Sequence, residues 1–170
     1  HKDQPLHTMT ILNLVFEGNE RFLLNEAMAF EVYRKAKHAV PLTEFVGVRF
    51  GARSIGYHLM VEQPNKAFLR RNQKNPNGDL FKLTWRGAGV EGTHEIKSNP
   101  ADGHQVVEEV IQAIGKHSRD EQYPVIDQWF NVDQVATYYA VNMLLSHWDG
   151  FHNNHFVYFD RNDTKRWEIY

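Results

Sequence analysis

The sequence predicts a mixed α+β domain, and three observations support that prediction. Apolar and polar residues alternate over 45–50 and 55–62, on either side of the turn-like sequence "GARS". Apolar residues recur at helical spacing over 103–117 and 131–148. The segments with strand periodicity come mostly before the long helical ones, an order typical of α+β domains rather than of alternating α/β folds.

The composition narrows the class of protein. With 170 residues, 42% of them hydrophobic and 13% aromatic, the chain can form one globular domain with a core. Its net charge of −2, without a long basic run, favours neither nucleic acid nor an anionic membrane as partner. We expect no membrane span, because every apolar run is short. The absence of cysteine excludes disulfides and thiolate chemistry. The chain begins without Met and ends on a strand-like run, so we interpret it as a piece of a longer protein.

The first half of the chain is expected to form a strand, a helix, a hairpin and a short helix. These elements are predicted over 8–15, 19–37, 45–50 with 55–62, and 64–71. Asn19 is a suitable N-cap for the long helix, and Pro64 suits the first turn of the short one. The inward face of the long helix is expected to consist of Leu23, Ala27, Phe30 and Tyr33.

The second half is expected to be richer in helix. The pattern predicts a turn at 75–79, a strand at 80–85, helices at 103–117 and 131–148, and a strand pair at 155–159 and 165–170. Asn131 can cap the last helix, with Gln134 at the capping-box position. The predicted buried faces are Val106, Val107, Val110, Ile111 and Ile114 on the first helix, and Val132, Val135, Ala136, Tyr139 and Met143 on the second.

The most informative stretch is "SHWDGFHNNHFVYF", a polar loop between a helix and a strand. It contains the spacing His-x-Asp-x-x-x-x-Asn, formed by His147, Asp149 and Asn154. Phosphoryl transfer requires an acid beside the acceptor hydroxyl and an oxygen ligand for a magnesium ion near the phosphates. Asp149 and Asn154 are suited to these two roles, because Mg²⁺ prefers oxygen ligands. His147 would brace the loop.

Two other interpretations of this loop stay open. Asp149-Gly150 is also an ordinary turn dipeptide, and short motifs often match by chance. Alternatively His147, Asp149, His152 and His155 could ligate zinc or a similar ion, which would indicate a metal-dependent hydrolase.

Several segments together resemble the spore-coat protein H (CotH) kinase family. The segment "FNVDQVATYYAVNMLLSHWDGFHNNHFVYFD" is similar to its signature region, and "VPLTEFVGVRFGARSIGYHLMVEQ", "GDLFKLTW" and "THEIKSNP" follow the family's order. The resemblance implies an atypical protein-kinase-like fold that binds ATP and Mg²⁺ and phosphorylates protein Ser or Thr; whether Mn²⁺ replaces Mg²⁺ stays open. It also implies a single kinase-like domain fragment, with an N-lobe-like part over 1–63 and a C-lobe-like part over 64–170. A spore-coat, extracellular or cell-surface location would follow.

The resemblance implies roles for individual residues. Asp149 would be the catalytic group and Asn154 a metal ligand. Nucleotide contacts would come from Glu26, Glu62, Gln63, Lys82 and Trp148. For the charged residues among these, a solvated or ion-paired side chain is the ordinary alternative. In the family, the main magnesium-binding Asp would follow Tyr170 and the phosphate-binding Lys would precede His1, so neither can be assigned within residues 1–170. A non-catalytic binding or structural protein with the same fold is therefore an alternative.

A glycine pattern in the middle of the chain is not expected to bind a cofactor. "RGAGVEG" contains Gly87, Gly89 and Gly92 at the spacing G-x-G-x-x-G. A dinucleotide site needs an amphipathic helix directly after such a pattern, and none is predicted there. We therefore expect a flexible loop.

Overall fold

The computed structural model describes residues 6, 8–85, 87–98 and 102–170. The chain divides into two compact units, His1–Gln73 and Lys74–Tyr170, which we call the N-terminal and C-terminal units. Each unit contains one small antiparallel sheet together with helices, so the predicted α+β class is confirmed. Within the described ranges, none of the helices has the length and apolar character needed to cross a membrane.

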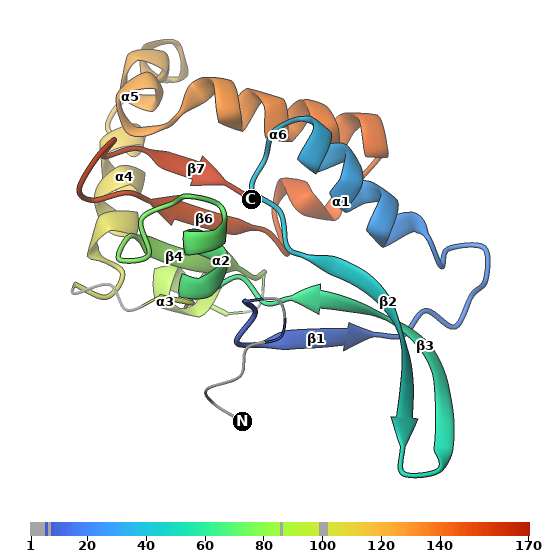
Figure 1. Cartoon of the computed structure of the whole chain (residues 1–170). Helices are drawn as coiled ribbons and strands as arrows, with labels where there is room; N and C mark the ends of the chain where they lie inside the picture. Colours follow the sequence, from blue (N-terminus) through green and yellow to red (C-terminus); the bar gives the residue numbers. More distant parts are fainter. Residues whose placement is uncertain (1–5, 7, 86, 99–101) are drawn as a thin grey trace. The chain divides into compact units, whose positions relative to one another are not determined.

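The N-terminal unit is built on a three-stranded antiparallel sheet in the order β1-β3-β2 (Figure 1). Its strands are β1 (Leu12–Val15), β2 (Thr43–Phe50) and β3 (Arg53–Glu62), and its helices are α1 (Asn25–Lys35) and α2 (Lys66–Arg71). The predicted hairpin is confirmed, with strands a few residues longer than the alternation indicated. Its register shifts between Val48 and Arg49, because Ile55 forms a bulge.

Both helices of this unit begin later than predicted. Asn19 does not cap α1: its side chain accepts a hydrogen bond from the Arg21 N–H in a turn, and the helix begins six residues further on. Leu23 therefore lies outside α1 and is exposed. Helix α2 is capped by Asn65, whose Oδ1 accepts from the Ala67 N–H at 2.8 Å, so the predicted first-turn position of Pro64 was wrong.

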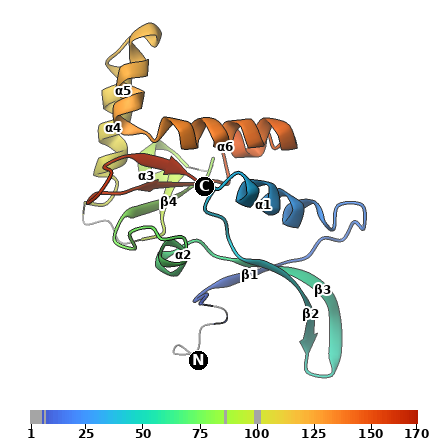
Figure 2. The ribbon, with the colours of Figure 1, turned by 45° about the horizontal axis from the view of Figure 1, so that its top comes forward.

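The C-terminal unit contains a four-stranded antiparallel sheet in the order β5-β4-β6-β7. Its strands are β4 (Asp79–Leu83), β5 (His94–Ile96), β6 (Phe156–Phe159) and β7 (Trp167–Ile169). Its helices are α3 (Gly89–Thr93), α4 (Gln105–Gly115), α5 (Gln122–Trp129) and α6 (Val132–Leu145), with 3₁₀ turns η1 (Arg119–Glu121) and η2 (Asp149–Phe151). Figure 2 shows α4 and α5 together at one side of this sheet and α6 leading away from them.

The core of this unit forms between α4 and one face of the sheet. Its buried members are Phe81, Val106, Val107, Val110, Phe159 and Trp167. Four of the five predicted inward residues of α4 are buried or pack against this core, whereas Ile111 is 49% exposed. On α6 the predicted face was only partly right. Val132, Val135 and Tyr139 are half-buried, but Met143 is 73% exposed, and the fully buried residues are Tyr138, Val141 and Asn142.

Three short elements were not predicted or were predicted differently. Strand β5 and helix α5 were missed. The glycine pattern forms the short helix α3 instead of a flexible loop, and the α-carbon of Gly87 packs against Gly92. Arg86, at the start of that pattern, and Asn99-Pro100, at the end of the "THEIKSNP" segment, lie outside the described residues.

Candidate active site

The candidate site is the loop that joins α6 to β6 in the C-terminal unit, and both of its ends are fixed. Ser146 ends α6 in a left-handed conformation, with φ 53°. The His147 N–H then donates to the Asn142 carbonyl at 2.9 Å. At the other end the Asn154 N–H donates to the Leu83 carbonyl at 3.1 Å, and the Leu83 N–H donates to the His155 carbonyl at 2.8 Å. The loop is thus attached to both α6 and the end of β4.

The two predicted site residues of this loop meet directly. The Asn154 side-chain amide donates to Asp149 Oδ2 at 2.6 Å. Asn154 has φ 52°, a left-handed conformation that asparagine tolerates better than most residues and that turns the chain back toward Asp149. The donation uses the amide nitrogen, so the amide oxygen, the atom suited to a metal ion, lies on the other side of the group. Asp149 and Asn154, the two residues that the motif spacing selected, are therefore in direct contact.

Asn153 is a third member of the site, and the motif spacing did not identify it. Its side chain is almost completely buried. Its Nδ2 donates to Asp149 Oδ1 at 3.1 Å, and its Oδ1 accepts from the Trp85 N–H at 3.1 Å. Asn153 therefore connects Asp149 to the chain directly after β4. The Asn-Asn pair was visible in the sequence, but the spacing alone selected only its second member.

The turn at Gly150 is held in place by three residues that contact it: Tyr138, Asn142 and His147. The Tyr138 hydroxyl donates to the Gly150 carbonyl at 3.0 Å. A β-carbon at position 150 would lie 2.4 Å from Asn142 Oδ1 and 2.9 Å from His147 Nδ1. The His147 ring thus braces the loop by packing against Gly150. Only glycine fits at this position without a shift of its neighbours.

The electrostatics of the loop favour an ionised Asp149. The hydrogen bond from Asn154 is the main cause that lowers its pKa, and the bond from Asn153 and the charges of His152 and His147 lower it further, against some opposing desolvation. Burial lowers the pKa of His155, which is therefore neutral at physiological pH. The arrangement presents one carboxylate, held by two amides, at the surface of the loop.

The imidazole groups do not form the alternative metal site. The buried His155 ring faces the Asn153 carbonyl, with Nδ1 at 3.2 Å from its oxygen. His152 packs on Trp148, with ring centroids 4.4 Å apart. Across 8–85, 87–98 and 102–170, no three His, Asp or Glu side chains lie close enough to hold a metal ion. The zinc interpretation thus has no geometric support, whereas Asp149 and Asn154 are two oxygen donors of the kind Mg²⁺ uses.

The other predicted residues of the C-terminal unit are Trp148 and Lys82. Trp148 lies in the loop, directly before Asp149, and is 65% exposed. Lys82 is half-buried on β4, opposite Phe156 of β6 and Glu95 of β5. Their nucleotide contacts stay predictions.

In the N-terminal unit Glu62 and Gln63 are held by hydrogen bonds at the end of β3. Glu62 is buried, forms an ion pair with Arg71, and accepts from the Leu42 N–H at 3.0 Å. Gln63 Oε1 accepts from Asn13 Nδ2 at 3.0 Å. These bonds fix the end of the strand, and both carboxylate oxygens of Glu62 are engaged by Arg71.

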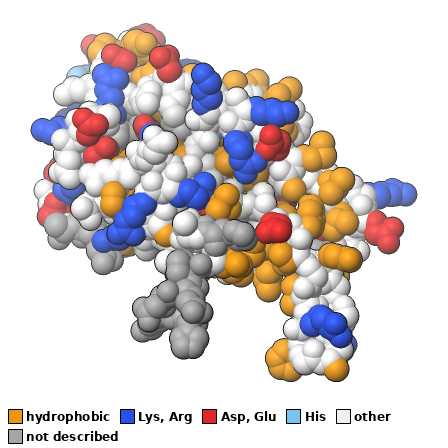
Figure 3. All heavy atoms as spheres, in the orientation of Figure 1, with side chains coloured by type: hydrophobic (Ala, Val, Ile, Leu, Met, Phe, Trp, Pro, Cys, Tyr) orange, Lys and Arg blue, Asp and Glu red, His pale blue; other side chains and the backbone are white. Residues whose placement is uncertain are grey.

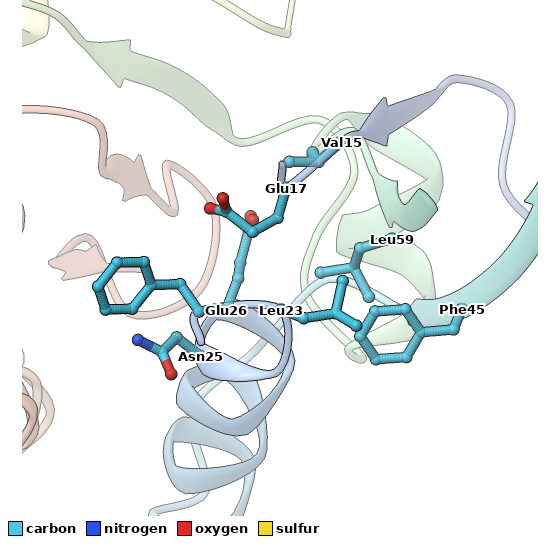
Figure 4. A pocket seen from close by; sticks show the side chains of 8 residues that line it. Val15, Glu17, Leu23, Asn25, Glu26, Phe45 and Leu59 are labelled. Carbon is cyan, nitrogen blue, oxygen red and sulfur yellow. The ribbon is translucent and has the colours of Figure 1, made fainter. Parts of the chain in front are cut away.

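Glu26 lies at a pocket between α1 and the sheet of the N-terminal unit, with a volume of about 250 Å³. Figure 4 shows Glu17 and Glu26 reaching toward the same side of the pocket, with Leu23, Leu59 and Phe45 on the other. Burial raises the pKa of Glu26. A neighbouring cationic group would oppose that rise by stabilising the carboxylate. The nucleotide contact of Glu26 stays a prediction.

A family model described as CotH kinase protein matches residues 1–170, the whole chain. No curated protein matches the chain significantly.

Proposed function

Because this chain belongs to the CotH kinase family, we propose that it is a protein kinase that transfers the γ-phosphoryl group of ATP to Ser or Thr of a protein. Family membership indicates a kinase-like protein. The more specific proposal depends on one observation: Asp149 is held between the amides of Asn153 and Asn154, in a turn fixed to α6 and β4. A preorganised carboxylate at a surface turn is what an acceptor hydroxyl requires.

The hydrogen bonds of Asp149 leave it able to receive a substrate. A carboxylate has about four lone-pair sites. Asn153 donates to Oδ1 at 3.1 Å and more weakly to Oδ2 at 3.4 Å, and Asn154 donates to Oδ2. Oδ1 therefore retains capacity to accept a hydrogen bond from a Ser or Thr hydroxyl and to take its proton as the new P–O bond forms. The lowered pKa suits a group that orients the hydroxyl and accepts the proton late, because phosphoryl transfer is largely dissociative.

The oxygen donors of the loop fit a hard divalent ion. In this proposal the amide oxygen of Asn154 is a ligand for Mg²⁺ or Mn²⁺. The bound ion would neutralise phosphate charge. The proposed nucleotide contacts are Glu26, Glu62, Gln63, Lys82 and Trp148. The proposed fold is an atypical kinase fold, with an N-lobe-like part over 1–63 and a C-lobe-like part over 64–170. The proposed acceptor is a coat or secreted protein.

The test is transfer from radiolabelled ATP by the full-length protein. Asp149→Ala should lower the transfer rate about a hundredfold or more, the range for loss of a positioned acid or base. Asp133→Asn changes an exposed acid in the first turn of α6 and serves as the matched control. Equal labelling by wild type and Asp149→Ala would show that Asp149 is not the catalytic group.

A non-catalytic binding protein with the same fold is the second candidate. One observation favours it: within the described ranges, no three His, Asp or Glu side chains lie close enough together to bind a metal ion. In that case the full-length protein would bind ATP or its protein partner without transfer, and Asp149→Ala would leave both affinities unchanged.

A further inference from the structure

The outer part of the β2–β3 hairpin, residues 47–58, has no third strand beside it among the residues that the structure describes. Strand β1 pairs only with the last four residues of β3, from Leu59 to Glu62. Beyond that point β2 and β3 continue as a two-stranded ribbon, which Figures 1 and 2 show extending past β1. Because an isolated two-stranded ribbon is marginally stable in water, this segment would gain from a partner.

The side chains of this ribbon are apolar, aromatic and cationic. Phe50 is 83% exposed and Tyr57 is 72% exposed. Arg53 lies opposite Phe50 in the register, and Arg49 precedes it. Figure 3 shows basic surface next to hydrophobic side chains at the end of the hairpin.

The two arginines have no acidic counterpart nearby. Residues 45–61 contain no Asp or Glu, in a chain whose net charge is −2. Arg49 Nη2 reaches the Ala52 carbonyl at 3.4 Å, and no ion pair joins Arg49 or Arg53 to any carboxylate that the structure describes. Exposed guanidinium groups beside an exposed ring are complementary to a partner that has both carboxylates and apolar side chains.

Strand β2 also offers an open backbone edge. It is the outer strand in the order β1-β3-β2, and its eight residues contain neither Pro nor Lys, the usual protections of an edge. Val46, Val48 and Phe50 alternate along it and share one face. Such an edge can accept an extended polypeptide as an added strand.

We propose that the edge of β2 and the arginines Arg49 and Arg53 bind an extended acidic segment of a partner protein. Backbone hydrogen bonds would form along β2, and apolar side chains would pack on Val46, Val48 and Phe50. Carboxylates on the other face would pair with Arg49, and a carboxylate at the end of the segment would pair with Arg53. A polypeptide fits better than a lipid surface, because lipid offers no groups to satisfy the backbone edge. If the proposed kinase activity holds, the partner is the phosphate acceptor.

The probe is a fluorescent peptide as long as β2, with alternating Val and Glu, tested against the full chain by anisotropy without nucleotide. The double variant Arg49→Glu, Arg53→Glu should weaken binding about tenfold, because each reversal removes one attraction and adds a repulsion. Phe50→Ser should weaken it without changing its salt dependence. The double variant Arg119→Glu, Arg166→Glu, at two exposed arginines of the C-terminal unit, is the charge-matched control and should bind like wild type.

Three further measurements separate the possible outcomes. The same peptide N-methylated at alternate residues keeps its side chains but loses donors, and it should bind much more weakly. Phosphatidylserine vesicles should bind no better to wild type than to the double variant. Asp149→Asn should bind the peptide normally, so a failed transfer assay would not affect this inference. The proposal would be overturned if the peptide did not bind, or if only the vesicles bound. It would also be overturned if binding were unchanged by the arginine reversals or by N-methylation.

Discussion

The α-carbon of Gly150 lies against the side chain of Asn142, and a β-carbon there would be 2.4 Å from Asn142 Oδ1. Asn142 cannot move aside easily, because it is completely buried and its Nδ2 donates to the Tyr138 carbonyl at 3.2 Å. The turn that carries Asp149 can therefore pack this closely against α6 only because its second residue, Gly150, has no side chain.

Gly150→Ala should displace this turn and destabilise the protein by about 1–3 kcal/mol, the usual cost of overpacking. Phosphoryl transfer should fall as well, because Asp149 moves with the turn. Thermal unfolding and the transfer assay measure the two effects. Gly115→Ala is the matched control, since a β-carbon there meets open space at the end of α4. Equal melting temperatures for the two variants would contradict the packing argument.

Asn153→Ala should lower the transfer rate more than it affects ATP binding. The change removes one donor from Asp149 and leaves the Trp85 N–H without its acceptor, which costs about 1–3 kcal/mol of stability. A positioning role predicts a lower kcat with an unchanged KM for ATP, whereas loss of a nucleotide contact would raise KM. Steady-state kinetics at a temperature where the variant is folded distinguishes these cases.

Asn154→Ala should raise the pKa of Asp149 toward its ordinary value, because the Asn154 hydrogen bond is the largest cause of its lowering. The folded-state pKa lies below the unfolded one. The bond therefore stabilises the protein above the unfolded pKa, and this contribution is lost as pH falls through the folded pKa. In the variant, the fall in transfer rate that accompanies protonation of Asp149 should begin at a higher pH.

Carboxyl NMR titration of Asp149 measures the shift directly. Asn162→Ala, in an exposed turn, provides the control and should leave the Asp149 titration unchanged. An Asp149 pKa that is the same with and without the Asn154 amide would remove the main reason for regarding the pair as a unit.

The sequence predicted best those elements whose signals are local. The β2–β3 hairpin follows from period-two alternation around a turn. Asn131 caps α6 as expected, accepting from the Gln134 N–H. The meeting of Asp149 and Asn154 was predictable, because a tight loop between a helix and a strand brings positions five apart together. Such features depend on neighbours in sequence rather than on tertiary packing.

The failures have identifiable causes. Helix α6 is apolar nearly all round, so periodicity could not select its buried face, and the polar Asn142 is buried because it supports the turn at Gly150. Helix α5 was missed because it contains a proline, Pro124, and proline usually breaks a helix. Pro124 is the third residue of α5, where an N–H needs no intrahelical partner. The Asn153–Trp85 bond joins residues 68 apart, which no local pattern can indicate.

A buried ion pair in the C-terminal unit gives the last prediction. Asp79 is completely buried, and Arg161 Nε lies 2.5 Å from its Oδ2, while Arg161 Nη1 lies 2.7 Å from Asp102 Oδ2. Asp79 Oδ1 has no hydrogen-bond partner among the residues described. Burial raises the pKa of Asp79, and Arg161 opposes that rise. Arg161→Leu should therefore destabilise the protein at neutral pH by about 3–5 kcal/mol, since it leaves a buried charge uncompensated.

The pH dependence of this loss identifies its cause. With Arg161 removed, the folded-state pKa of Asp79 rises further above the unfolded value of about 4. The variant's free energy of unfolding should then fall as pH rises from that value through the folded pKa, and its deficit should be smallest in acid, where Asp79 is protonated. Chemical denaturation across this range measures the trend. Arg166→Leu, at an exposed arginine, should be nearly neutral, and adding Asp79→Asn to Arg161→Leu should recover stability. A deficit independent of pH would mean that Arg161 contributes through packing rather than by compensating the Asp79 charge.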